Sequence, residues 1–584
     1  MFETSINDSG QLFFVNVPVE NRLDSAALFT RLNDENLLKN REPLIRIASL
    51  QDLFEESSPN NKNVHFIYIP PKLPSGGRKR PNPVSVSDIP PERDLKKMRA
   101  YSDTPSLLAT PSRYQAAQCI PTARLIYDDR PGPDYGVAPI ALLYPPYGDF
   151  LDACAKPLPK EFEAIDLIAM MREVDALVVI AAGFHKDEDE RNNQFIDALN
   201  RIFQCYHDRS EPLAPMSRAI IAQKRTTDGH TSGPITDRAL EVKCSTGNAT
   251  SNGEVQIALY VHNINASAQE RCPKLFERYR VPTLAMTLIG EKRFHPTITL
   301  CQYVVCFGGP GPSLQFFGMV QLNKMPRQVA LTPSFRLVQC PGDGGGYACG
   351  RVDSPLYRAF AAALVLCKRI TKDMKDWMNA ADSDTNAPII PIQNYTLPAI
   401  SQIGDVRFQI ESKLGLDHGP SYVYLARTEQ GRDVVVKFSE QYCQVLHNFC
   451  AEKGMAPKLL GYENLPGGWI GVVMGYLPDS HPLADPRFTS EEKQKMCDKL
   501  KACARAMHDN GYVHGDLRET NVIGVKEGTV WIIDFDWGGE DGKAEYPHAS
   551  LNEHLLDKDQ KDLVIRRAHD ERVLRTTIAR ILGS

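Results

Sequence analysis

The 584-residue chain lacks the features of several common classes of protein. No apolar run reaches the roughly 18 residues that a membrane-spanning helix needs, and the first eight residues lack the basic-then-apolar pattern of a signal peptide. With 67 Lys and Arg against 72 Asp and Glu, the net charge is -5, which argues against a uniformly basic coat for nucleic acid. We therefore expect an intracellular protein with no membrane segment.

Ordered cysteine motifs and a P-loop are also missing. The 14 Cys are scattered, with no Cys-x-x-Cys pair and no Cys/His group at zinc spacing. We expect reduced thiols in a cytosolic or nuclear setting. The Gly-rich stretch 342–346 is not followed by Lys and Ser or Thr, so we interpret it as a turn. The length predicts about three to four domains.

The most informative stretch lies near the C-terminus. Residues 514–521 read His-Gly-Asp-Leu-Arg-Glu-Thr-Asn, and a later apolar run ends at Asp534. Phosphoryl transfer uses this arrangement, because Asp516 can accept the proton of an incoming hydroxyl while Asn521 and Asp534 hold metal ions. The structural alternative is an acidic surface loop that follows a buried strand.

Further nucleotide-binding elements precede this stretch. A β-branched run carries Lys437, which is placed to pair with the α- and β-phosphates of ATP. Gly415 and Gly419 lie between two strand-like runs, as a reduced form of a glycine-rich phosphate cover. The backbone from Met474 to Leu477 is expected to meet adenine at an interlobe hinge. ATP and Mg²⁺ are the cofactors that this set implies.

One element of that set is missing. The helix after the Lys437 strand should contribute a Glu that holds the lysine. Gln444 stands where this Glu is expected, with Glu440 and Glu452 at the two ends of the helix. A nucleotide-binding pseudokinase scaffold without turnover is therefore the competing prediction.

Together these motifs resemble the eukaryotic-type protein kinases, with Gly515 in place of the usual Arg and Asp536 in place of the usual Gly. They look most like small fungal kinases and the kinase-like tails of Crinkler proteins. The resemblance implies a two-lobed kinase-like domain over 400–584 that phosphorylates a protein hydroxyl; a small-molecule acceptor and nucleotide binding alone are the alternatives. Fewer than fifty residues follow Asp536 and no Ala-Pro-Glu is present, so we expect an abbreviated C-lobe.

A second group of candidate catalytic residues lies in the middle of the chain. Glu241 and Lys243 fall in a predicted strand whose alternation puts both on one face. Asp228 lies in a turn-like segment before it, and a helix after it carries Gln256 and Tyr260 one turn apart. Two carboxylates and a lysine at a sheet edge can bind Mg²⁺ and activate water beside a phosphodiester.

This pattern resembles the PD-(D/E)xK restriction-endonuclease-like superfamily, including its variant with a helical Gln and Tyr. The resemblance implies a nuclease-like α/β/α core over 161–372 that acts on nucleic acid. Asp228 and Glu241 would be its metal ligands, and Lys243 would be catalytic. By the same resemblance, Gln256 and Tyr260 would lie near the substrate, and Glu190 would be an extra carboxylate from the first helix.

Three observations qualify this resemblance. Thr227 stands where the motif has Pro, and Asp237 competes with Asp228 for the aspartate role. Asp237 precedes Glu241 by only four residues, which leaves little room for a hairpin, so we prefer Asp228. An exposed cross-strand ion pair is the structural alternative for Glu241 and Lys243.

Around this group, periodicity predicts further elements. Apolar runs suggest a helix at 163–171 and a strand at 176–182, and an amphipathic pattern predicts a helix over 187–203. Strands are expected within 283–289, 303–307 and 315–322, followed by a helix over 356–370.

The N-terminal 73 residues combine strand-like runs at 11–18 and 64–69 with a short helical pattern at 25–32. The stretch 45–54 and the strand after it resemble the later half of a Crinkler header, a ubiquitin-like targeting module. A small β-rich segment without a separate function explains these residues equally well. The targeting module would be partial, because its usual opening hairpin is not evident.

Residues 74–160 are rich in Pro, Ser and Gly, and we expect mostly linker there. Two basic clusters fall in this segment: Arg78, Lys79 and Arg80, then Lys96, Lys97 and Arg99. They suit a nuclear-import address or a solvated linker equally well.

The sequence thus predicts a multidomain α+β and α/β protein. Its parts are a segment resembling a partial Crinkler targeting module (1–73), a linker (74–160), a nuclease-like domain (161–372), a second linker (373–399) and a kinase-like domain (400–584). We expect an effector resembling Crinklers, with ATP, a protein substrate and nucleic acid as partners. It would act in the nucleus or cytoplasm, after entering another cell by a non-classical route.

Overall fold

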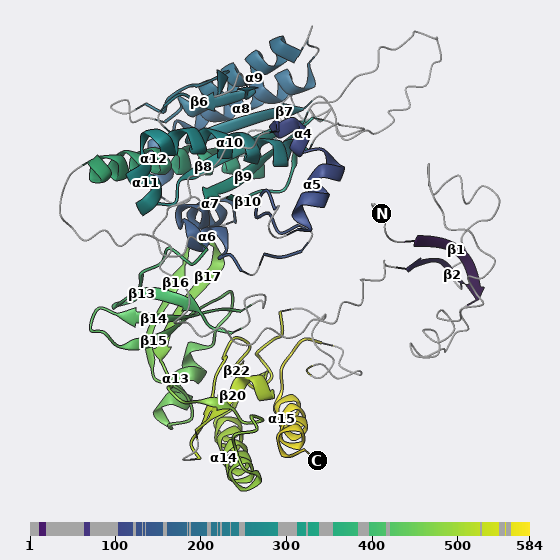
Figure 1. The fold of residues 1–584 in the computed structure, drawn as a ribbon, viewed down its shortest axis with the longest axis vertical. Helices are drawn as coiled ribbons and strands as arrows, with labels where there is room; N and C mark the ends of the chain where they lie inside the picture. The colour runs from purple at the N-terminus through teal and green to yellow at the C-terminus, as the bar shows by residue number, and fades with distance from the viewer. Residues whose placement is uncertain are drawn as a thin grey trace. The chain divides into compact units, whose positions relative to one another are not determined.

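The computed structural model describes residues 11–18, 63–69 and, with gaps, 103–583. The longer gaps are 207–211, 244–251, 290–311, 338–353, 383–395, 416–420 and, apart from Leu555, 548–561. The chain forms two compact units, Met1–Arg93 and Asp94–Ser584. In the first unit, β1 (Gln11–Pro18) pairs antiparallel with β2 (Asn63–Ile69), as Figure 1 shows.

Both N-terminal strands confirm the strand predictions at 11–18 and 64–69. Their runs are rich in aromatic and β-branched residues, and two prolines after β2 cannot extend a ladder. The predicted helix at 25–32, the Crinkler-like stretch at 45–54 and both basic clusters lie outside the described residues. The ubiquitin-like targeting module therefore stays a prediction.

The second unit begins with a domain built on a seven-stranded sheet in the order β10-β9-β8-β7-β6-β3, with β11 paired to β9. Its strands are β3 (Met216–Ser217), β6 (Gly229–Thr231), β7 (Arg238–Lys243), β8 (Pro282–Ile289), β9 (Ser313–Gln321), β10 (Pro326–Ala330) and β11 (Phe335–Arg336). Only β7 and β8 are parallel among these pairs, and α10 (Gly253–Arg271) makes the crossover that parallel strands require.

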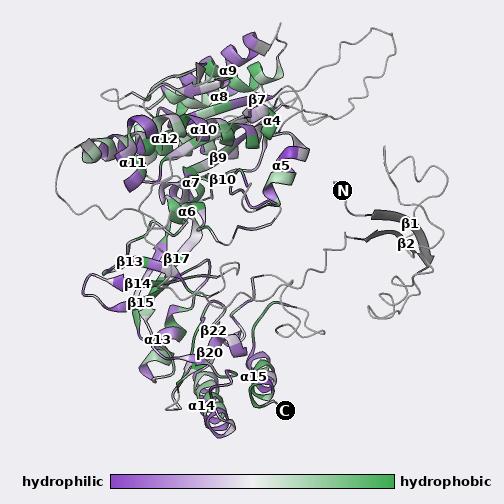
Figure 2. Ribbon diagram, viewed as in Figure 1, coloured by the Kyte–Doolittle hydropathy of each residue, from purple (hydrophilic) through white to green (hydrophobic). Residues whose placement is uncertain are grey.

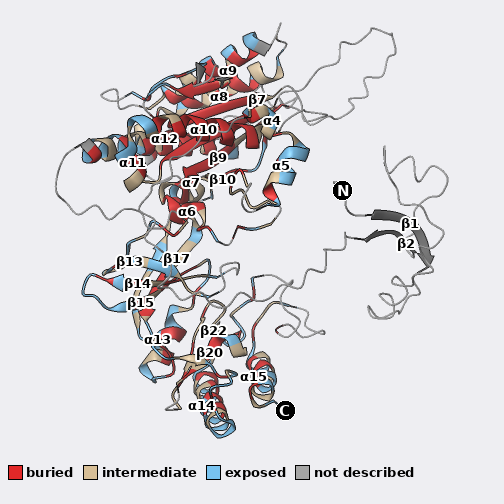
Figure 3. Cartoon of the chain, viewed as in Figure 1, coloured by how far each residue is buried: buried red, intermediate tan, exposed pale blue. Residues whose placement is uncertain are grey.

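Helices cover both faces of this sheet. Leu240 and Val242 of β7 pack in a core shared with α8 (Leu167–Ala182), α9 (Glu188–Phe203) and α12 (Pro355–Asp382). Ala239, whose side chain points to the opposite face, packs in a second core with α10. Figure 3 accordingly shows the central strands as buried, and the layers are α/β/α.

Several helix and strand predictions hold, and one is wrong. The helices over 187–203 and 356–370 appear as α9 and α12, and the strands at 283–289 and 315–322 as β8 and β9, while 303–307 lies outside the described residues. The predicted strand at 176–182 is instead the second half of α8. A short apolar run does not distinguish a strand from a buried helix, and the Asp166 cap starts a helix long enough to include it.

The expected linker at 74–160 also differs from the structure, whose described residues from 103 to 155 include four helices. They are α4 (Pro105–Leu108), α5 (Pro111–Gln118), α6 (Ile140–Leu143) and α7 (Pro146–Ala155). Prolines lie at the start of α4, α5 and α7, where a missing N–H costs nothing. The proline content that suggested a linker therefore marks helix starts.

Apolar residues from this segment complete the sheet's core. All four residues of α6 are buried and hydrophobic (Figures 2 and 3). The Tyr147 ring of α7 is fully buried against Gly318 of β9, and its hydroxyl accepts the N–H of Met319 at 3.1 Å. The high average content of Pro, Ser and Gly over 74–160 does not reveal these buried apolar residues. The expected domain end at 372 likewise falls inside α12.

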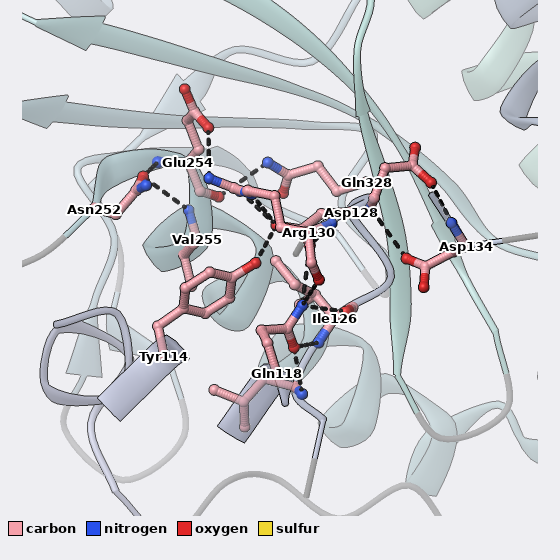
Figure 4. Close-up of polar contacts among 12 residues, drawn as sticks. Tyr114, Gln118, Ile126, Asp128, Arg130, Asp134, Asn252, Glu254, Val255 and Gln328 are labelled. Carbon is pink, nitrogen blue, oxygen red and sulfur yellow. Dashed lines mark hydrogen bonds and ion pairs between the residues drawn. The ribbon is translucent and has the colours of Figure 1, made fainter. Parts of the chain in front are cut away.

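Residues 124–130 extend the edge of the sheet beside β10. The Tyr127 N–H donates to the Pro326 carbonyl and the Gln328 N–H to the Tyr127 carbonyl, both at 2.9 Å. Figure 4 shows how this segment is fastened to α10: Arg130 pairs with Asp128 and, at 3.4 Å, with Glu254 in the first turn of α10.

The C-terminal part has two lobes. The first contains a six-stranded sheet, β12-β13-β14-β15-β17-β16, and the helix α13 (Gln444–Glu452). Its strands are β12 (Gln402–Ile403), β13 (Val406–Lys413), β14 (Tyr422–Thr428), β15 (Asp433–Ser439), β16 (Leu459–Leu465) and β17 (Trp469–Gly475).

The second lobe contains α14 (Ser490–Asp509) and α15 (Arg567–Leu582) with two small sheets. These sheets are β18 (His481–Pro482), β20 (Val522–Gly524) and β21 (Val530–Ile532), and the pair β19 (Tyr512–Val513) and β22 (Gly539–Glu540). A capping box between Thr489 and Glu492 begins α14. In the described residues, no helix combines the length and apolarity needed to cross a bilayer.

The contact between α7 and β9 can be tested by Gly318→Ala. An added Cβ would lie 3.1 Å from the Tyr147 ring and 3.0 Å from Ile140, so the change overpacks a buried site. We expect it to lower the free energy of unfolding by about 1–3 kcal/mol in urea denaturation of the full chain. Gly132→Ala, where the added Cβ has no neighbour within 4 Å, is the control. Equal stability of the two variants would contradict the packing of α7 on β9.

Candidate active site

The loop at 514–521 is held by a buried carboxylate on α15. Asp570, 1% exposed, accepts the backbone N–H of His514 at 2.7 Å and of Gly515 at 2.8 Å. Gly515 has a φ of 82°, a left-handed conformation that suits glycine. The residue that replaces the usual Arg therefore also allows the turn by which both N–H groups reach Asp570.

The loop presents Asp516 and Asn521 together. The Asn521 amide nitrogen donates to the Asp516 carbonyl at 3.1 Å, which leaves the amide oxygen as the end able to bind a cation. Both carboxylate oxygens of Asp516 accept bonds from the Arg518 guanidinium, one of them at 2.6 Å. Asp516 is thus held in one orientation at the centre of the loop.

Asp534 lies beside this loop in a strained backbone conformation. Its φ is 69°, which is uncommon for a residue with a Cβ and is found most often at functional sites. Lys437 of β15 donates to Asp534 Oδ1 at 2.6 Å. The N–H of Ile533, next to Asp534, donates to the Asn521 carbonyl at 3.0 Å. The structure therefore brings Lys437, Asp516, Asn521 and Asp534 to one place.

A second carboxylate contacts Lys437. Asp536 Oδ1 lies 2.6 Å from the Lys437 ammonium, and Asp536 Oδ2 accepts the Ser439 hydroxyl at 2.9 Å. Burial raises the pKa of Asp536 to about 6 against the opposing effect of Lys437. Burial also acts to raise the pKa of Asp534, but the charge and hydrogen bond of Lys437, together with His514 and Asp536, outweigh it and hold that pKa below its ordinary value. Both carboxylates in turn raise the pKa of Lys437, although burial acts to lower it.

A cavity of about 540 Å³ begins where β17 leads out of the first lobe. Leu477 lines it together with Val525 and Trp531 from the second lobe. Its volume is in the range of small-molecule sites. Met474, the other predicted hinge residue, is buried in the core that continues into the second lobe.

The predicted phosphate cover is only partly described. Gly415 has a φ of 91° with open space around it, as a turn glycine requires, between β13 and β14. Gly419 lies outside the described residues.

The oxygen donors fit a magnesium ion that shares its coordination with phosphate. Asn521 and Asp534 offer amide and carboxylate oxygens, and Mg²⁺ is commonly bound by one or two carboxylates plus substrate phosphates. Within the described part of the chain, no group of three or more His, Cys, Asp and Glu side chains could hold a metal alone. The residues therefore fit a metal that arrives with a nucleotide.

Sequence reasoning missed two residues of this site. Asp570 follows Asp516 by more than fifty positions, and no local pattern distinguishes it from the other carboxylates of α15. Asp536 stands out in the sequence only as a departure from the usual Gly. Ser439 is the available signal. It is a polar residue on the same face of β15 as Lys437, and its hydroxyl donates to Asp536.

The middle domain brings together a second group of predicted residues. Lys243 Nζ lies 2.8 Å from Glu241 and donates to the Gln256 side chain of α10 at 2.7 Å. Asp228 accepts the Val242 N–H at 2.8 Å and an amide N–H of Asn192 at 3.0 Å. Glu241 is 2% exposed, so the pair with Lys243 is no surface ion pair.

The remaining candidates of this group are placed differently. Asp237 accepts the Thr371 hydroxyl of α12 at 2.8 Å, on the opposite face from α10, which supports Asp228 as the nearer carboxylate. Tyr260 packs with Ile264 one turn further along α10. Glu190 is exposed and accepts from Gln194 along the surface of α9, whereas Asn192 of that helix reaches Asp228.

Comparison with known proteins bears on the C-terminal part. The model of the RIO domain family matches residues 469–559, which include Asp516, Asn521 and Asp534. The RIO domain belongs to an atypical protein kinase family whose members bind ATP with Mg²⁺. The C-terminal domain is kinase-like. The match leaves out Lys437 and α15, which the geometry alone assigns to the same site.

Two other comparisons complete these findings. Among solved structures, the kinase PK-1 of Cydia pomonella granulovirus is similar, with 17% sequence identity and a TM-score of 0.26. The alignment covers 30% of this chain and 68% of the viral chain. No curated protein matches the chain.

The anchoring role of Asp570 is tested by Asp570→Ala. The backbone N–H groups of His514 and Gly515 would lose their acceptor in a buried site, at about 1–3 kcal/mol for each group. We expect a lower urea midpoint for the second lobe, followed by the fluorescence of Trp531 and Trp537. Glu571→Ala, which removes an exposed carboxylate of the same helix, should leave the midpoint nearly unchanged. Equal midpoints would contradict the anchor.

Proposed function

We propose that the chain is an ATP-dependent phosphotransferase that transfers the γ-phosphoryl group of ATP to a protein hydroxyl. The observation that carries the proposal is the convergence of Asp516, Asn521, Asp534 and Lys437 at one place between the lobes. The RIO-domain match over the loop that holds three of these residues supports it.

Each residue has a role that its position suits. Adenine would occupy the cavity beside Leu477, and Lys437 would bind the α- and β-phosphates. Asp516 would accept the proton of the acceptor hydroxyl as its oxygen attacks the γ-phosphorus and ADP leaves. Asn521 and Asp534 would hold Mg²⁺, which neutralises the phosphate charge.

Arg518 has a role that follows from its contact. Its guanidinium donates to both oxygens of Asp516, and a phosphate would offer the same planar cation an alternative partner. Asp516 would then be released to meet the acceptor hydroxyl.

Phosphoryl transfer is tested with the full chain, Mg²⁺, labelled ATP and a generic protein acceptor. Asp516→Asn should lower the transfer rate about 10²–10⁴-fold, because the proton acceptor is lost while the shape is kept. Asp498→Asn, which removes an exposed carboxylate on α14, should leave the rate unchanged.

Two results would count against this proposal. Equal transfer by the chain and by Asp516→Asn would remove Asp516 from the reaction. ATP binding without any transfer by the unsubstituted chain would favour the competing function, a nucleotide-binding pseudokinase scaffold.

We also propose a second function, metal-dependent cleavage of nucleic acid by the middle domain. The contact of Lys243 with both Glu241 and Gln256 carries it, with Asp228 at the neighbouring strand turn. Along the chain, α9 precedes the sheet strands β3, β6 and β7, and α10 lies in the crossover to the parallel strand β8; this order agrees with the PD-(D/E)xK resemblance. A middle domain that binds nucleic acid without cleaving it is the alternative.

The nuclease proposal is tested with plasmid DNA and single-stranded RNA in Mg²⁺ or Mn²⁺. Cleavage should fall at least about 10²-fold in Glu241→Gln and in Lys243→Met, because each removes a charge from the site. Asp189→Asn, an exposed carboxylate on α9, is the control. No cleavage by the unsubstituted chain with either metal would contradict catalysis, and retained binding would then support the alternative.

A further inference from the structure

In the kinase-like site, the buried Lys437 needs an anionic partner besides the metal-binding Asp534. Its side chain is 8% exposed, and a buried ammonium that is not paired is strongly disfavoured. In kinases a Glu on the helix after the strand is the usual partner. The anionic group that pairs with Lys437 in this chain determines how the lysine is oriented toward phosphate.

The helix α13 offers no carboxylate to Lys437. The three residues that the sequence suggested, Gln444, Glu440 and Glu452, are all exposed. The buried side chains of α13 are Leu446, His447 and Cys450, none of which is an anion.

The histidine of α13 makes its hydrogen bonds to groups other than Lys437. His447 accepts or donates at the Tyr442 hydroxyl, 2.6 Å away, and contacts the Pro457 carbonyl at 2.8 Å. Its ring stacks on Phe535 with centroids 4.7 Å apart and planes at 11°. The helix therefore packs against the segment that carries Asp534 and Asp536 through an aromatic contact.

We propose that Asp536 takes the place of the missing helix glutamate and is the positioning residue that holds Lys437. The proposal rests on the phosphotransferase function given above. Asp536 Oδ1 lies 2.6 Å from the Lys437 ammonium, and the Ser439 hydroxyl, two residues along the same strand, donates to Oδ2 at 2.9 Å. Lys437 and Ser439 point to the same face of β15, so both oxygens of Asp536 are bound from one strand.

The backbone fixes Asp536 in this position. The Cys443 N–H, just before α13, donates to the Phe535 carbonyl at 2.9 Å. Asp536 is thus tied to α13 on one side and to β15 on the other. In this arrangement, Lys437 depends on the segment after Asp534 and not on a movable helix.

The pairing is tested by a double-mutant cycle on the melting temperature of the full chain, with Asp536→Asn and Lys437→Met. Asp536→Asn should lower the melting temperature of the unsubstituted chain. In the Lys437→Met background the same change should raise it, because it removes one of two partly buried carboxylates that have lost their counter-ion. The same shift in both backgrounds would overturn the pairing.

The positioning role is tested separately by kinetics. Asp536→Asn should lower kcat at saturating Mg²⁺ and ATP at least about 10-fold, with the Mg²⁺ concentration for half-maximal rate unchanged within about 2-fold. A higher Mg²⁺ requirement with normal kcat would overturn the proposal, since Asp536 would then act on the metal. Asp498→Asn is the control for both measurements.

The two measurements distinguish the failure of this inference from that of the proposed function. The cycle needs no activity, so it decides the pairing whether or not the chain transfers phosphate. An unsubstituted chain without transfer would count against the phosphotransferase function and the positioning role, while the coupling on melting would still report the ion pair.

Discussion

The site between the two lobes depends on one buried cation, the ammonium of Lys437. Because a buried charge must be paired, it fixes Asp534 and Asp536 at 2.6 Å each and so ties β15 to the segment after β21. Phe535, between the two carboxylates, then meets His447 of α13. A single charge thereby connects strand, helix and loop.

A second buried charge has the corresponding role in the other lobe. Asp570 accepts two backbone N–H groups of the loop that carries Asp516, and it lies on the last helix of the chain. The abbreviated C-lobe expected from the sequence therefore still has a helix that anchors the loop. Within the described residues, this lobe has no further helix between β22 and α15.

The middle domain uses its sheet in a different way. Alternation along β7 sends Leu240 and Val242 into one core and Glu241 and Lys243 toward α10, where Gln256 meets the lysine. The Glu241 side chain is buried and that of Lys243 partly buried, so forming this pair costs desolvation free energy. That cost, and the placement of Asp228 beside it, are why cleavage of nucleic acid merits a direct test.

The sequence by itself determined many local features: several strands of both domains, α9 and α12, and the residue types of the two candidate sites. These follow from periodicity and from motifs within a few tens of residues. Tertiary structure alone decided that α8 continues through 176–182, that prolines at 105–146 start helices, and which carboxylates serve Lys437 and the 514–521 loop. Those outcomes depend on which distant groups become buried together. A buried polar or charged group needs a partner, and no local sequence pattern identifies the residue that provides it.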